Sequence, residues 1–166
     1  WVDYDNDGLL DLFIGRTGGV LSSLYRQNAD NTFTKNTAAG DLVNTVHSVF
    51  GTAWADFDND GDQDVFVVDQ EGGQPNKLFS NNGDGTFTKL TGTAFDADAA
   101  LNPQSASWAD FDNDQDLDLF VGDSDGTNAL FRNNGNGTFT KLTATAFDVS
   151  NGGALGSNWA DVNNDG

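Results

Sequence analysis

The chain has 166 residues, 37% of them hydrophobic, which is enough for one domain with its own core. Its formal net charge of -19 repels nucleic acid and anionic membrane surfaces at long range, so we expect neither nucleic-acid binding nor membrane insertion. The chain contains no Cys, which excludes a disulfide framework and a zinc-thiolate site.

A tryptophan opens the same acidic phrase four times, and this repeat organises the whole sequence. The phrase reads Trp-(Val/Ala)-Asp-x-(Asp/Asn)-Asn-Asp and recurs at steps of 53, 54 and 51 residues. It begins at Trp1, Trp54, Trp108 and Trp159. We therefore expect a single repeat domain, 1–166, with repeats at about 1–53, 54–107 and 108–158 and the start of a fourth at 159–166.

The segments between the acidic phrases have the pattern of short β-strands. In the first repeat we expect strands at 11–14, near 24–27 and at 32–35. In the second repeat they are expected at 48–55, at 64–68, around 78–79 and at 86–89, and the third repeat follows the same plan. The run 64–68 is continuously apolar after its first residue, which is typical of a strand buried on both faces.

The turn between the last two strands of each repeat contains Asn and Gly in the second and third repeats. There the sequence Asn-Gly-x-Gly supplies residues that accept the positive φ of a tight hairpin. In the first repeat the same turn, 28–31, reads Asn-Ala-Asp-Asn. Because it lacks glycine, we expect this turn to be more strained or more open than the other two.

Four short strands in each period, with no helical periodicity, indicate an all-β fold of β-propeller blades, each blade a four-stranded antiparallel sheet. We considered a parallel β-helix and a β-sandwich as alternatives. Parallel β-helices built on calcium repeats use much shorter periods, and a sandwich does not require the same phrase in every repeat.

The acidic phrase continues into the strongest chemical signal of the sequence, a nine-residue loop with Asp at positions one, three, five and nine. Oxygen ligands at alternating positions around a tight turn are how a short loop binds Ca²⁺, with position seven giving its backbone carbonyl. We therefore predict about one Ca²⁺ for each complete loop, three in all. The expected ligands are Asp3, Asp5, Asp7, Leu9 and Asp11; Asp56, Asp58, Asp60, Asp62 and Asp64; Asp110, Asp112, Asp114, Asp116 and Asp118; and, in the incomplete fourth loop, Asp161, Asn163 and Asp165.

The loops are not identical, and they differ from the helix-loop-helix type of calcium site. That type needs a Glu at position twelve, where this chain has Ile14, Val67 and Val121. Gln115 replaces the glycine of position six, so the third loop must tolerate an unfavourable backbone angle or bind more weakly. We expect residue type to matter little at position seven, because this position contributes its backbone carbonyl. We expect the fourth loop to bind poorly unless further residues complete it.

The loop, the apolar strand after it and the Asn-Gly-x-Gly-Thr-Phe hairpin resemble the FG-GAP and VCBS repeats that form the propeller of integrin α subunits and of many bacterial secreted proteins. Phe50-Gly51 precedes a loop only once and no Gly-Ala-Pro occurs, so the bacterial style of repeat is the more similar. The resemblance implies an extracellular protein, secreted or at the cell surface. Family propellers have about seven blades, so we expect a segment of a longer chain and, as partners, further blades or copies of this chain.

Our leading hypothesis is a non-enzymatic segment that calcium rigidifies, used for adhesion, assembly or display of a protein or glycan ligand. The alternatives are a carbohydrate-binding lectin propeller and the scaffold domain of a larger polysaccharide-active enzyme. The Trp residues could stack on sugars, although their fixed position favours packing between blades. His47 could act in catalysis or metal binding. Pairs of Asp residues could act as acid and base in a glycosidase, but the calcium loops already account for the regularly placed Asp residues.

Overall fold

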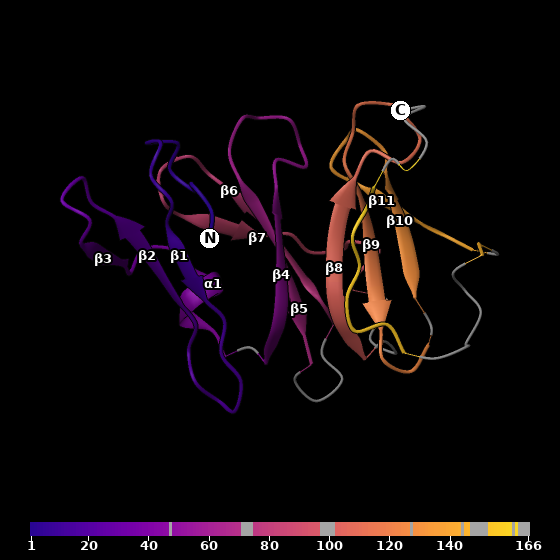
Figure 1. The fold of residues 1–166 in the computed structure, drawn as a ribbon, viewed down its shortest axis with the longest axis horizontal. Helices are drawn as coiled ribbons and strands as arrows, with labels where there is room; N and C mark the ends of the chain where they lie inside the picture. Colours follow the sequence, from indigo (N-terminus) through magenta and orange to yellow (C-terminus); the bar gives the residue numbers. More distant parts are fainter. Residues whose placement is uncertain are drawn as a thin grey trace.

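The chain forms three antiparallel sheets that stand side by side, as a computed structural model shows (Figure 1). The structure describes residues 1–46, 48–70, 75–96, 102–126, 128–143, 145–146, 153–160 and 162. We name the sheets blade 1, with strand order β1-β2-β3, blade 2, with β4-β5-β6-β7, and blade 3, with β8-β9-β10-β11. Every strand pairs with its neighbours in the sequence, so each blade is a simple meander. The prediction of an all-β fold of propeller blades is confirmed.

Most strands begin and end within two residues of the predicted limits. In blade 1 they are β1 (Leu12–Ile14), β2 (Ser23–Gln27) and β3 (Phe33–Asn36). In blade 2 they are β4 (Val49–Ala55), β5 (Asp64–Asp69), β6 (Lys77–Asn81) and β7 (Phe87–Lys89). In blade 3 they are β8 (Pro103–Ala109), β9 (Asp118–Asp123), β10 (Ala129–Asn133) and β11 (Phe139–Leu142). Every residue of β5 is buried, as its continuous apolar run predicts.

The blades are offset from the sequence repeats by one strand. Trp54 lies near the end of β4, where it pairs with Val65 of β5, so the segment before each acidic loop is the first strand of the blade that follows. Within the described residues blade 1 has three strands. An isolated bridge between Val2 and Asp11 joins the two ends of its acidic loop.

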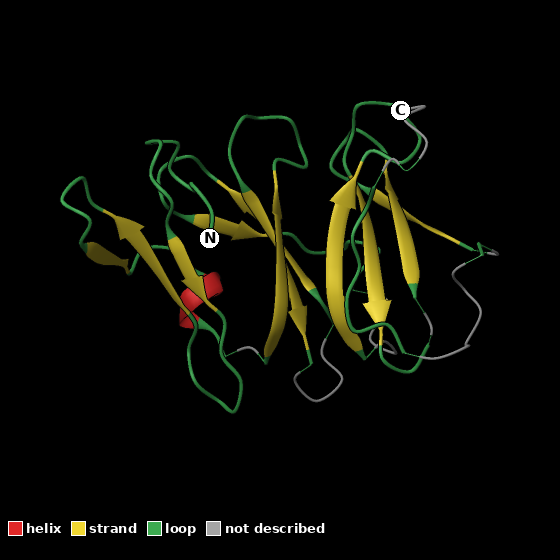
Figure 2. Ribbon diagram, in the orientation of Figure 1, coloured by secondary structure: helices red, strands yellow, loops and turns green. Residues whose placement is uncertain are grey.

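A four-residue helix, α1 (Asp41–Asn44), was not predicted from the sequence (Figure 2). It follows Gly40, whose φ of 60° is readily accessible to glycine, and Asp41 places a carboxylate in its first turn. Leu42 and Val43 of α1 are buried among residues of blades 1 and 2. The connection between these blades therefore supplies part of the core. No helix that the structure describes is long and apolar enough to span a membrane.

The core lies between the blades, in two clusters of buried side chains. One fills the space between blades 1 and 2 and includes Leu24 and Phe79. The other fills the space between blades 2 and 3 and includes Phe66 and Phe131. Phe95, in the connection from blade 2 to blade 3, is 1% exposed and lies with its ring centroid 5.1 Å from Phe66 and 4.6 Å from Phe131.

Two of the tryptophans pack between blades, as their fixed position predicts. Trp54 of blade 2 contacts Phe13 of blade 1 edge to face, with ring centroids 5.9 Å apart. Trp108 of blade 3 stacks on Phe57 of blade 2 at 6.0 Å, and its indole N–H donates a hydrogen bond to the Ala53 carbonyl at 3.2 Å. Neighbouring sheets are therefore joined by contacts between aromatic rings, and the indole N–H of Trp108 has a hydrogen-bond acceptor.

The sequence predicts that the first hairpin turn is either more strained or more open than the others, and the second of these outcomes is wrong. The Asn28 N–H donates to the Thr32 carbonyl at 2.8 Å, and the equivalent bonds in the other blades measure 3.1 and 3.0 Å. Asn31 takes the left-handed conformation with a φ of 62°, in the place that Gly85 occupies in blade 2. Asn tolerates this region better than other residues with a side chain, so the turn closes without glycine.

Candidate metal centres

The three acidic loops lie at the same end of the blades (Figure 1). The second and third join the first strand of a blade to its second, and the first loop leads into β1. The three loops therefore lie side by side across one end of the molecule (Figure 1). This arrangement follows from the sequence because each loop precedes an equivalent strand.

The loops are folded by hydrogen bonds from their own backbone to their own carboxylates. In loop 1, Asp3 at position one accepts the N–H groups of Asp7 at 3.1 Å and Gly8 at 2.9 Å. Asp7 at position five accepts the N–H of Leu9 at 2.9 Å. Loops 2 and 3 repeat all three bonds within 0.1 Å of these distances. Positions one and five thus form the turn around which the remaining ligands are placed.

Two positions of each loop require the left-handed backbone conformation. Position four is Asn in every complete loop, with φ values of 57°, 61° and 60° at Asn6, Asn59 and Asn113. Position six is glycine in loops 1 and 2, whereas in loop 3 Gln115 has a φ of 77°. The third loop therefore tolerates the unfavourable angle, which is one of the two outcomes that the sequence predicts.

The carboxylate at position nine is the deepest of each loop. Asp11, Asp64 and Asp118 are all fully buried, and each begins or immediately precedes the strand that follows its loop, which is β1, β5 or β9. Both oxygens of Asp64 are held by backbone N–H groups, from Phe57 at 3.1 Å and from Asn81 at 2.8 Å. Hydrogen bonds of this kind fix the side chain and leave further lone pairs for a cation.

Burial disfavours the charged form of these position-nine groups. It raises the pKa of Asp64 to about 7, although the two N–H donors oppose the rise, and the charges of Asp58 and Asp60 add to it. Burial likewise raises the pKa of Asp118 to about 6 and raises that of Asp11. Carboxylates in this environment gain stability from a cation that neutralises them.

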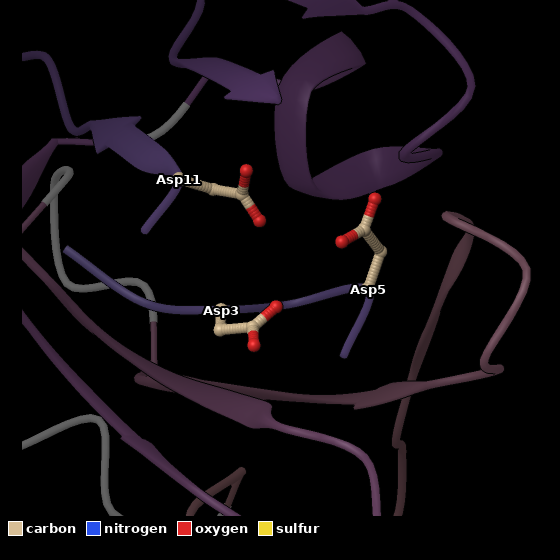
Figure 3. Close-up of side chains that lie close together, drawn as sticks. All are labelled: Asp3, Asp5 and Asp11. Carbon is tan, nitrogen blue, oxygen red and sulfur yellow. The ribbon is translucent and has the colours of Figure 1, made fainter. Parts of the chain in front are cut away.

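Positions one, three and nine come together in every complete loop. Ligand atoms of the three carboxylates lie within 4.8 Å of one another in each cluster, and Figure 3 shows those of loop 1 around a common space. Position five is not part of the clusters. The clusters consist of Asp3, Asp5 and Asp11; Asp56, Asp58 and Asp64; and Asp110, Asp112 and Asp118.

The donor set fits a hard divalent cation. It consists only of carboxylate oxygens, which Ca²⁺ and Mg²⁺ prefer, and contains no sulfur or imidazole. In loop 1, Oδ1 of Asp5 is buried with no hydrogen-bond partner among the described residues, so this oxygen is available to a cation. Each cluster can therefore hold a metal ion.

Loop 1 differs from the others because a cation of the protein already contacts it. The Arg26 guanidinium, from β2, pairs with Asp5 at position three of the loop. Its Nη2 atom also lies 2.6 Å from Oδ2 of Asp7 at position five. Ser80 occupies the equivalent place in blade 2 and Arg132 in blade 3. Arg132 is exposed and forms no ion pair with a carboxylate that the structure describes.

Not every predicted ligand is placed by the structure. The fourth-loop residues Asp161, Asn163 and Asp165 lie outside the described residues, as does His47. The carbonyls of Leu9, Asp62 and Asp116 remain predicted ligands. The expectation that residue type matters little at position seven does not hold for loops 2 and 3, because two of these side chains make specific hydrogen bonds.

Those hydrogen bonds join neighbouring loops, and sequence reasoning missed the residues that make them. Asn6 of loop 1 donates to the Asp62 carboxylate at 2.8 Å, and Asn59 of loop 2 donates to that of Asp116 at 3.0 Å. The signal was an Asn at position four of every complete loop. Arg26 was also missed, and its only signal was a basic residue in an acidic repeat.

The comparisons with known proteins agree with the repeat. A family model described as an FG-GAP-like repeat matches residues 3–67, 56–121 and 110–166. Cartilage acidic protein 1 of Xenopus tropicalis is 31% identical over 135 residues, which are 78% of this chain and 18% of that protein. The human protein of that name is 29% identical over 129 residues, 74% of this chain and 19% of its own length. The chain thus spans less than a fifth of these relatives, and it belongs to the FG-GAP-like repeat family.

Proposed function

We propose that the chain is a calcium-binding structural segment of a secreted or cell-surface β-propeller, with no catalytic role of its own. The observation that carries the proposal is the convergence of three Asp carboxylates in each of three equivalent loops. The likeness to cartilage acidic protein 1, a protein named for cartilage, supports an extracellular location. Calcium is the common divalent cation there, and extracellular modules bind it with dissociation constants of about 0.1 to 1 mM.

In this proposal the ion stabilises the fold. A filled loop removes the repulsion among its carboxylates and fixes the connection into the buried second strand. Without Cys, the chain has no disulfide to do this. The role resembles that of a structural metal, in which the binding free energy adds to the free energy of folding.

We propose further blades, or copies of this chain, as partners that cover the outer blades. Large apolar side chains are exposed there, including Trp1 at 70% and Phe33 at 42% in blade 1 and Leu155 at 77% after blade 3. Such groups are typical of surfaces that become buried on association. The completed assembly would serve adhesion, assembly or ligand display.

The test is the number of ions bound by the full chain, measured by isothermal titration calorimetry with CaCl₂. We expect about three Ca²⁺ per chain, as the three complete clusters predict. Asp56→Asn should remove the ion of loop 2. The control is Asp125→Asn, which also removes one negative charge. Asp125 follows the end of β9 that is farther from loop 3, so this variant should leave the stoichiometry unchanged. No binding, or binding that Asp56→Asn leaves intact, would contradict the proposal.

A further inference from the structure

A buried asparagine ends the third strand of blades 2 and 3. Asn81 closes β6 and Asn133 closes β10, and each is 1% exposed. Their side-chain amides reach across to the preceding blade, where Asn81 donates to the Tyr4 carbonyl at 2.7 Å and Asn133 donates to the Phe57 carbonyl at 2.8 Å. The two acceptors are position two of loops 1 and 2.

The backbone of the same asparagine holds the acidic cluster of its own blade. The Asn81 N–H donates to Oδ1 of Asp64 at 2.8 Å, and the Asn133 N–H donates to Oδ1 of Asp118 at the same distance. Each asparagine therefore contacts position nine of its own loop and position two of the neighbouring loop. Because it is buried, it has no water to replace either bond, and loss of a partner is costly.

The position-two peptide completes a continuous path between clusters. The Tyr4 N–H donates to Oδ2 of Asp11, and the Phe57 N–H donates to Oδ2 of Asp64, both at 3.1 Å. A chain of hydrogen bonds thus runs from Asp118 through Asn133 and Phe57 to Asp64. From Asp64 an equivalent chain runs through Asn81 and Tyr4 to Asp11.

Neighbouring loops also touch at a second, exposed point. The Asp62 and Asp116 side chains, which accept from Asn6 and Asn59 of the preceding loop, lie against hairpin glycines of their own blades. A Cβ atom on Gly83 would approach Asp62 Oδ2 to 2.6 Å, and one on Gly135 would approach Asp116 Oδ2 to 2.4 Å. Loop 1 has Leu at position seven, and its hairpin has Ala in place of this glycine.

Blade 1 provides an internal contrast. Gln27 stands at the equivalent place, and its N–H still donates to Oδ1 of Asp11 at 2.7 Å. Its side-chain amide, however, donates to Asn31 in the same blade at 3.4 Å. The structure describes no blade before blade 1, so Gln27 keeps the local bond of this position without a bond between blades.

We infer that Asn81 and Asn133 are positioning residues that couple the metal clusters, so that an ion bound in one loop raises the affinity of the next. The inference rests on the proposed calcium binding. An ion that fixes position nine of one loop orders the asparagine beside it, and the asparagine orders the position-two peptide of the neighbouring loop. Coupling of this kind is reciprocal, and typical values change affinity by about 5- to 150-fold.

The first test needs no substitution. Calcium titration of the unmodified full chain, with a competing chelator to resolve stepwise constants, should give a binding curve steeper than that of three independent sites. A Hill coefficient above one is the expected result. Binding that fits independent sites would overturn the coupling and leave the proposed function standing, whereas no binding at all would overturn the proposed function itself.

The second test assigns the coupling to the asparagine. Asp3→Asn is first introduced to prevent calcium binding in loop 1. In this variant the calcium affinity of loop 2 is measured twice, once with loop 3 intact and once with calcium binding in loop 3 prevented by Asp110→Asn. We expect silencing of loop 3 to weaken loop 2 by about fivefold or more. With Asn133→Ala added, the affinity of loop 2 should no longer depend on loop 3.

The matched control is Asn134→Ala, one residue further along. Among the residues that the structure describes, the side-chain amide of Asn134 bonds only to Thr138 and Thr140 of its own hairpin, so this variant should retain the coupling. If Asn133→Ala does not fold, Asn133→Ser keeps a small polar side chain that is too short to reach Phe57 and replaces it in the cycle. Coupling that survives loss of the Asn133 amide would overturn the assignment.

Discussion

Single residues give the three acidic loops different electrostatic environments. Asp64 at position nine accepts two backbone N–H groups and forms no ion pair with a cationic side chain that the structure describes, and burial raises its pKa to about 7. Loop 1 has a comparable aspartate in Asp11, but Arg26 pairs with two of the neighbouring carboxylates. Loops of nearly identical sequence therefore differ in their electrostatics.

The raised pKa of Asp64 predicts how the metal-free protein responds to pH. In the unfolded chain this carboxyl loses its proton near its ordinary pKa of 3.8, whereas in the folded chain it keeps the proton up to about pH 7. The folded state binds more protons within this window, so its stability should fall as pH rises from about 4 to about 7. Urea unfolding in chelator at several pH values measures this.

Asp64→Asn is the control for that experiment, because the whole chain also becomes more negative as pH rises. The variant should show a weaker loss of stability over the same window. Equal slopes for the two proteins would show that Asp64 does not contribute to the pH dependence.

Arg26 pairs with Asp5 and Asp7, so under the proposed calcium binding it would compete with the ion for these two carboxylates. Arg26→Ala should therefore raise the calcium affinity of loop 1 by roughly two- to fivefold, a modest effect because the guanidinium is exposed. Calorimetry with loops 2 and 3 silenced by Asp56→Asn and Asp110→Asn isolates this loop. Arg132→Ala removes the same charge without removing a described ion pair and should change the affinity less; an equal effect would mean that only net charge matters.

At the scale of the elements, the connections between blades supply buried side chains to the core, as the strands do. Phe95 lies in the segment from β7 to β8 and packs on Phe66 and Phe131 of two different blades. Helix α1 has the same role between blades 1 and 2. Such segments carry no strand or helix periodicity, but they fill the space between sheets.

Phe95→Ala should lower the free energy of unfolding by about 3 to 5 kcal/mol, because it removes a fully buried ring and leaves a cavity between blades 2 and 3. Chemical denaturation at saturating calcium measures the loss. Phe50→Ala is the matched control, since Phe50 is 50% exposed in β4 and should lose much less. Similar losses in both variants would mean that the contacts of Phe95 do not hold the blades together.

The strands were predicted well because local pattern is sufficient for them. β5 is a continuous apolar run, and the hairpins carry Asn and Gly where positive φ is needed. The nine-residue loops were predicted for the same reason, since their carboxylates converge through bonds within one loop. Contacts between residues far apart in the sequence, such as that of Asn59 with Asp116, 57 positions later, were not predicted, because they depend on how blades pack.

At the scale of the whole molecule, the three acidic loops and the two core clusters are connected across the same interfaces between blades. The apolar clusters lie between the blades, and the acidic loops lie at one end of them. The hydrogen bonds of Asn81 and Asn133 connect the loops across the same interfaces. Metal binding is therefore expected to stabilise the packing of blades as well as single loops.

The melting temperature of the full chain in calcium and in chelator tests this account most directly. With calcium at roughly ten to a hundred times the dissociation constant, each filled loop adds about 1.4 to 2.7 kcal/mol to the free energy of unfolding. Three filled loops should raise the melting temperature by roughly 10 °C or more. Mg²⁺ at equal concentration controls for screening of the net charge and should have a smaller effect. Equal melting temperatures in calcium and in chelator would contradict the proposal that the acidic loops hold stabilising ions.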